Sequence, residues 1–96
     1  MRYVVIVAGP NEFERMVAED AARMDRPRVR GRKGDYIVIN DDVRYMRIGE
    51  RSVTRLRGFS GPTELRISPN YYVSAGRLEE IRHHVNIMNA TTRAAS

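Results

Sequence analysis

A continuous apolar run near the N-terminus constrains the fold of this chain more than any other part of its sequence. Residues 3–8 read YVVIVA, so an extended chain here has no charged side chain on either of its faces. A strand with one face in water alternates apolar and polar residues, whereas a strand covered on both faces does not. The run therefore predicts the central strand of a parallel sheet, with a layer of protein on each side.

Two segments have the periodicity of amphipathic helices. The first spans residues 12–24 and follows Asn11, a residue type that caps helix N-termini. The second follows Ser74, which is also a capping residue. Its apolar stripe repeats at three- and four-residue steps through Leu78, Ile81, Val85 and Met88. A short third helix is expected over residues 50–57.

Further strands are predicted between and after these helices. Residues 36–39 form a second apolar run, and residues 63–67 alternate as in a strand. Residues 43–48 alternate imperfectly, and two interpretations stay open: a strand that pairs back as a hairpin, or irregular chain. Strands that alternate with helices indicate an α/β fold. We expect a small, mainly parallel sheet of three to four strands with two long helices and one short helix, in the order β-α-β-(β)-α-β-α.

The length of 96 residues fits one domain, predicted over residues 1–90, with residues 91–96 as a flexible C-terminal tail. The chain has no cysteine, which excludes disulfides and thiolate metal sites and fits a reducing compartment. No apolar run approaches the roughly 20 residues of a membrane-spanning helix. These features predict a cytoplasmic protein without a membrane partner.

The chain is basic, and almost all of its positive charge is arginine. It has 17 Lys+Arg against 12 Asp+Glu, a formal net charge of +5, and Lys33 is its only lysine. The guanidinium fork of arginine suits phosphates and carboxylates, so the expected partner is nucleic acid or an acidic protein surface. Arginine without lysine is also typical of GC-rich genomes. Selection for binding and the base composition of the genome therefore stand as alternative causes of the arginine excess.

The predicted nucleic-acid-binding set joins the densest arginine run, residues 26–34, with the arginines of the middle segment. If the two segments fold side by side, they make one patch that binds backbone phosphates without reading sequence. No helix-turn-helix, zinc-finger or RNA-recognition signature is present. The set consists of Arg26, Arg28, Arg30, Arg32, Lys33, Arg44, Arg55 and Arg57. Three aromatic residues in predicted loops can stack on bases or anchor a protein interface, namely Phe59, Tyr71 and Tyr72.

Two segments resemble the P-loop and RecA-like ATPase core of helicases and phage DNA-packaging motors. Residues 36–42, an apolar strand that ends in two aspartates, look like a Walker B strand. Residues 55–59, RLRGF, precede a strand and are similar to the arginine-glycine turn of those motors. The size, the arginine bias and this core also resemble small accessory proteins of actinobacterial phages. That resemblance implies a location in the cytoplasm of the host cell.

The phosphate-binding loop of that family is missing. After its first strand a P-loop protein needs a glycine-rich loop that ends in Gly-Lys-Ser/Thr. Residues 8–12 read AGPNE instead, so the turn has no lysine, Pro10 has no amide hydrogen to donate, and Glu12 would repel phosphate. The resemblance therefore implies a degenerate P-loop domain that does not hydrolyse nucleotides.

Other catalytic and metal-binding patterns are weak, and we expect no enzyme activity, cofactor or metal. Asp41 and Asp42 could hold Mg²⁺, but we interpret them as a solvated turn because no third ligand is apparent. His83 and His84 are adjacent, so on a helix they point about 100° apart and cannot share one ion. The sequence has neither a cysteine nucleophile nor a Gly-x-Ser-x-Gly motif.

Two functions of different classes follow. The first is a non-enzymatic, phage-type accessory protein that binds nucleic acid, or another acidic partner, through an arginine-rich surface. The alternative is a protein-protein interaction module that binds or modulates a host protein. Self-association is compatible with both, because residues 43–48 would form an exposed edge strand if they fold as one.

A third hypothesis is a remnant nucleotide site around Gly9 and Asp41. Ligands of parallel sheets bind at the carboxyl ends of the strands. The turns after Ala8 and Ile39 are both expected at that edge, together with the loop that carries the paired tyrosines.

Overall fold

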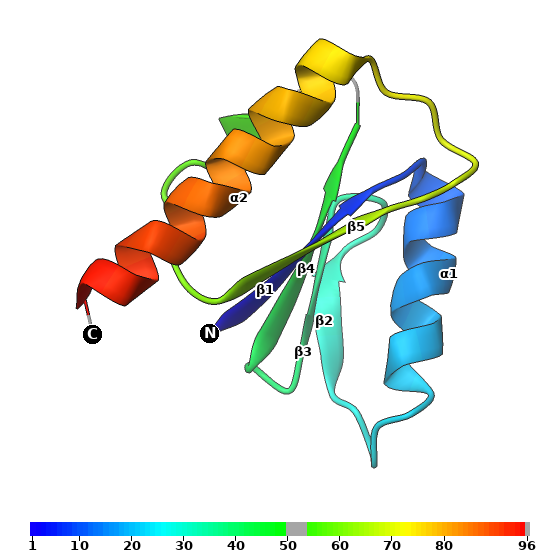
Figure 1. The fold of residues 1–96 in the computed structure, drawn as a ribbon. Coiled ribbons are helices and arrows are strands. Elements are labelled where there is room, and N and C mark those ends of the chain that lie inside the picture. The colour runs from blue at the N-terminus through cyan, green and yellow to red at the C-terminus, as the bar shows by residue number, and fades with distance from the viewer. Residues whose placement is uncertain (50–53, 96) are drawn as a thin grey trace.

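The apolar run near the N-terminus forms strand β1 (Arg2–Val7), an interior strand with a parallel neighbour on each side, although it is fourth of five in the sheet rather than its central strand. The structure is a computed structural model that describes residues 1–49 and 54–95. β1 pairs in parallel with β4 (Val43–Ile48) on one side and with β5 (Thr63–Ile67) on the other. Residues 3–8 are all buried, because helix α1 (Pro10–Ala21) covers one face of the sheet and helix α2 (Ala75–Ala95) covers the other (Figure 1).

Two further strands extend the sheet beyond β4 and make it mixed rather than mainly parallel. β3 (Tyr36–Ile39) runs antiparallel to β4, and β2 (Val29–Arg32) runs antiparallel to β3. The spatial order is β2-β3-β4-β1-β5, with two parallel and two antiparallel pairs. The α/β class is thus confirmed, but the sheet has five strands rather than three to four.

The strand missing from the sequence-based prediction is β2, which lies within the arginine run. All four of its residues are exposed, because β2 is an edge strand. Such a strand is held by backbone hydrogen bonds to β3 and has no apolar face to reveal it in the sequence. Of the two interpretations left open for residues 43–48, the structure has the hairpin, formed by β3 and β4.

The helices differ from their predicted bounds mainly at the ends. α1 begins at Pro10 with Gly9 as its N-cap residue and ends at Ala21, three residues before the predicted Met24. Proline suits a first helical position because it has no amide hydrogen to leave unpaired there. α2 follows Ser74 as predicted, and its helical backbone continues to Ala95, into the segment expected to be a tail.

The short helix expected over residues 50–57 corresponds in part to a single 3₁₀ turn, η1 (Thr54–Leu56). Residues 50–53 lie outside the described part of the chain. The turn places Leu56, which is buried, against the α2 side of the sheet.

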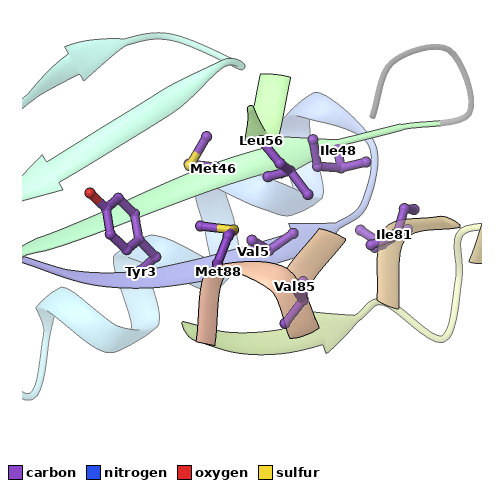
Figure 2. Close-up of a cluster of buried hydrophobic side chains, with 9 residues drawn as sticks. Tyr3, Val5, Met46, Ile48, Leu56, Ile81, Val85 and Met88 are labelled. Carbon is purple, nitrogen blue, oxygen red and sulfur yellow. The ribbon is translucent and has the colours of Figure 1, made fainter. Parts of the chain in front are cut away.

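Alternate residues of β1 serve two separate hydrophobic cores. On the α2 side the buried cluster consists of Tyr3, Val5, Val7, Met46, Ile48, Leu56, Ile81, Val85 and Met88 (Figure 2). On the α1 side it consists of Val4, Ile6, Ala8, Phe13, Val17, Ile39, Val43 and Tyr45. No helix within residues 1–49 and 54–95 is long and apolar enough to cross a membrane.

Candidate nucleic-acid interface

The candidate site lies on the α2 side of the sheet, over the strands that α2 does not cover. α2 packs on β1 and β5, and no described helix lies on this side of β2 (Figure 1). The strand register pairs Arg30 with Val38 and Val38 with Arg44. It likewise pairs Arg32 with Tyr36, and Tyr36 with Met46.

Residues paired across neighbouring strands point to the same face of a sheet. Because Met46 belongs to the α2-side core, both rows of residues point to that side. We call this surface the arginine face and define it as Arg30, Arg32, Tyr36, Arg44, Arg55 and Phe59. The last two residues reach it from the segment that follows β4.

Arg44 is held between two aromatic rings. Its guanidinium carbon lies 4.2 Å from the ring centroid of Tyr36 and 4.8 Å from that of Phe59. The Phe59 ring is itself packed against Tyr3, with centroids 5.7 Å apart. Guanidinium groups bind aromatic faces at such distances, so the two rings fix the position of the charged group.

The charge of Arg44 has no carboxylate partner among the described residues. Its Nε atom is buried and is the one buried side-chain nitrogen or oxygen of the described chain without a hydrogen-bond partner. The neighbouring Arg55, in contrast, is paired with Asp35. An arginine fixed in place and left without an anion is a ready position for an anionic ligand.

Around Arg44 the surface forms a shallow pocket of about 230 Å³. The pocket is lined by Asp35, Tyr36, Arg44, Met46, Arg47, Arg55 and Phe59. Sites that enclose a whole small molecule usually measure roughly 300–1,000 Å³. This pocket is therefore suited to one flat or anionic group of a larger ligand rather than to a complete small substrate.

The nearby Arg47 has a structural role at the end of the sheet. Its Nε donates to the carbonyl oxygen of Gly34 at 2.5 Å, and another guanidinium nitrogen donates to that of Ala8 at 3.3 Å. These bonds connect the turn between β2 and β3 to the end of β1. We therefore leave Arg47 out of the arginine face.

The remaining predicted basic residues are exposed but do not line the pocket. Arg30 Nε donates to Asp41 Oδ1 at 3.0 Å, an ion pair in which both side chains are largely exposed. Arg26 and Arg28 precede β2, Lys33 lies in the turn that follows it, and Arg57 comes directly after η1. The structure thus brings together Arg30, Arg32, Arg44 and Arg55 and leaves the other four of the predicted set around them or apart.

Of the three aromatic residues predicted to stack or to form an interface, only Phe59 belongs to the arginine face. Tyr71 packs against the α2-side core. Tyr72 is 85% exposed. Both follow β5, at the other side of the sheet from β2.

Tyr71 lines a second pocket, which lies where β1 and β5 end and α1 begins. Its other lining residues are Gly9, Pro10, Asn11, Glu12, Ser68 and Asn70. Ser68 Oγ donates to Glu12 Oε1 at 2.9 Å, and this bond, with the nearby Arg15, lowers the pKa of Glu12. An ionised carboxylate at this helix N-terminus disfavours a bound phosphate.

The structure also separates the two residues of the hypothetical remnant nucleotide site. Gly9 lies two residues after Val7, the last residue of β1, whereas Asp41 precedes β4, whose first residue pairs with Arg2 at the start of β1. Six residues of strand span about 20 Å. The turn after Ile39 is at the opposite edge from the one expected because β3 runs antiparallel to β4.

The sequence-based prediction misses Tyr36 and Asp35. Tyr36 belongs to a run whose pattern predicts a strand buried on both sides, and its position beside arginines becomes visible only once β2 is known. Within residues 1–49 and 54–95 no group of three His, Cys, Asp or Glu side chains could hold a metal ion.

No family model, curated protein or solved structure matches the chain, so its function has to be inferred from this geometry.

Proposed function

We propose that the protein binds nucleic acid through the arginine face and acts as an accessory module without catalytic activity. The observation that carries the proposal is the alternation of arginines and aromatic rings on one open side of the sheet. The resemblance of the chain to small accessory proteins of phages favours a role in the cytoplasm of the host cell.

The charges on this face favour a polyanion. Of its four arginines, Arg30 is paired with Asp41 and Arg55 with Asp35, so the face keeps a positive excess. Strands in a sheet are spaced about 5 Å apart, which places Arg30 and Arg44, on β2 and β4, roughly 10 Å from each other. Arginines at that spacing can contact successive phosphates of one backbone.

A salt titration with charge-matched variants tests the proposal. We expect the wild-type chain to bind labelled nucleic acid with an affinity that falls steeply as salt rises, because bound phosphates release counterions. Arg30→Gln with Arg32→Gln should weaken binding and reduce the slope of log K against log[salt] by about 0.7–0.9 for each phosphate that the variant no longer binds. Both residues are exposed, so the fold should tolerate the change.

The matched control is Arg15→Gln with Arg23→Gln, which removes the same charge from two exposed positions, one in α1 and one just after it, on the other side of the sheet. It should leave most of the affinity and the salt slope unchanged. The proposal fails if the wild-type chain does not bind at low salt. It also fails if both double variants lose affinity equally, since net charge alone would then explain binding.

A protein-binding role is the second candidate, and the exposed aromatic and apolar side chains near β5 favour it. Tyr72 is 85% exposed and Ile67, at the end of β5, is 39% exposed. Large apolar side chains that are exposed to solvent in an isolated chain often belong to protein interfaces. Capture of one defined host protein after nuclease treatment, lost in Tyr72→Ala but kept in Arg30→Gln with Arg32→Gln, would support this function over the first.

A further inference from the structure

We infer that the arginine face takes unpaired nucleic acid, with one base stacked on Tyr36 and the adjacent phosphate bound by Arg44. This inference rests on the proposed function and specifies its ligand as a single strand. Three features of the face lead to it: the ring of Tyr36, the charge of Arg44 without a carboxylate partner in the described chain, and the pairing of β3 on both of its sides.

The ring of Tyr36 is partly exposed and lines the pocket. Arg44 packs on one face of the ring, with its guanidinium carbon 4.2 Å from the ring centroid. Arg32 lies directly across from Tyr36 in the register of β2 and β3. A base placed on the other face of the ring would extend the existing stack of Phe59, Arg44 and Tyr36 toward Arg32. Bases stack on both aromatic rings and guanidinium planes.

The charge of Arg44 supplies the second contact. Arg30 and Arg55 are each paired with an aspartate, whereas Arg44 has no such partner in the described chain. A phosphate next to the stacked base would therefore neutralise a fixed cation of the pocket that has no carboxylate partner among the described residues. One nucleotide unit could in this way bind to Tyr36 and Arg44 together.

The pairing of the strands favours a single strand over a duplex as the ligand. In a duplex the faces of the bases are stacked on one another and cannot reach a ring on a protein surface. A duplex is instead read by an element that enters its groove, such as a helix or a two-stranded ribbon. Here β3 is paired on both sides, so β2 and β3 do not project as a free ribbon.

Binding of a short single strand and of its duplex, measured at the same salt concentration, tests the inference. The wild-type chain should prefer the single strand. Tyr36→Leu should weaken single-strand binding roughly 5- to 150-fold, the usual effect of losing one stacked base, and leave duplex binding unchanged. Tyr36→Phe keeps the ring and should retain the affinity. Tyr72→Leu is the matched control, because it removes an exposed tyrosine away from the arginine face.

A fluorescent reporter covers the case in which Tyr36→Leu does not fold. The chain has no tryptophan, so Tyr36→Trp introduces a single indole at the proposed stacking position. A single strand should quench its emission, whereas the indole of Tyr72→Trp should stay unquenched.

The results separate the two proposals. Equal affinity for single strand and duplex, or equal quenching at both indole positions, would overturn the inference. If binding still depended on Arg30 and Arg32, the proposed function would nevertheless stand. If neither nucleic acid bound at low salt, both proposals would fail together.

Discussion

At the scale of single residues, Gly31 shows why the arginine run can form a strand. Its φ of +152° is unfavourable for other residues, and a Cβ atom there would lie 2.3 Å from the carbonyl oxygen of Tyr36. Gly31→Ala should therefore force β2 away from β3 and destabilise the protein by at least about 1–3 kcal/mol, the usual effect of backbone strain. Urea unfolding followed by circular dichroism measures this loss.

Gly76→Ala is the control for that substitution. Gly76 lies in the first turn of α2, and a Cβ atom added there meets nothing within 4 Å. Alanine has the higher helix propensity, so this variant should be as stable as the wild type or more so, by up to about 1 kcal/mol. Equal destabilisation by the two substitutions would show that Gly31 is not a special position.

A second residue-scale feature is the buried hydroxyl of Tyr45, which makes stability depend on pH. Tyr45 donates to Asp20 Oδ2 at 2.8 Å, and Asp20 is also paired with Arg66 at 2.9 Å. Burial, together with the bond to Asp20, raises the pKa of Tyr45 to about 12. The folded state thus holds this proton more tightly than the unfolded state, whose tyrosine has a pKa near 10.

The sign of the effect follows from that difference. The stabilisation is complete below pH 10 and is lost as the pH rises from 10 to 12, because only the unfolded chain releases the proton there. The free energy of unfolding of the wild type, measured in urea at each pH, should fall more steeply over this interval than that of Tyr45→Phe. Parallel curves for the two proteins would contradict the assignment.

At the scale of elements, the success of the sequence-based prediction depends on burial. β1, β5 and both helices have apolar patterns because each packs against a core, and such patterns can be recognised without the fold. β2 has no buried face, so nothing in the letters RPRVRGRKG distinguishes an edge strand from a loop. The prediction misses the number of strands and the mixed pairing of the sheet for that reason.

The candidate site is predictable only in part, for a related reason. Arg30, Arg32 and Arg44 are recognisable by residue type, which marks them as possible phosphate ligands. Their common face follows from the register of β2, β3 and β4, which the sequence does not specify. Tyr36 escapes the prediction because its run of apolar neighbours indicates a buried strand.

The exposed edge of β5 is protected by a side chain of α2. The backbone amide of Thr63 donates to Asn89 Oδ1 at 2.8 Å, and Asn89 Nδ2 donates to the carbonyl oxygen of Thr63 at 3.1 Å. The amide group of Asn89 thereby takes the place of a neighbouring strand. Natural proteins block their edge strands in such ways to prevent pairing between copies.

Asn89→Ala should therefore have two effects. Loss of two partly buried hydrogen bonds should lower the free energy of unfolding by about 1–3 kcal/mol. The freed edge should also promote self-association, visible as a concentration-dependent mass in analytical ultracentrifugation. Asn86→Ala removes an exposed asparagine from the same helix and should do neither. A monomeric Asn89→Ala variant would show that the edge is protected by other means.

At the scale of the whole molecule, the sheet combines a rigid centre with an open flank. β1 is buried and hydrogen-bonded on both sides, whereas β2 is exposed along its whole length and bonded on one side. Stability against local opening rises with burial and with the number of neighbouring elements. In amide hydrogen exchange we therefore expect β1 to exchange slowest and β2 to exchange much faster than the centre.

Binding at the arginine face should change this gradient in one place. If a single strand contacts β2, β3 and the segment around Phe59, amides there should exchange more slowly when it is bound, while those of α1 on the opposite side keep their rates. The same comparison with Arg30→Gln and Arg32→Gln should show little protection. Slower exchange centred on α1 or on β5 would place the ligand on another surface, whereas uniform slowing would indicate general stabilisation without locating a site.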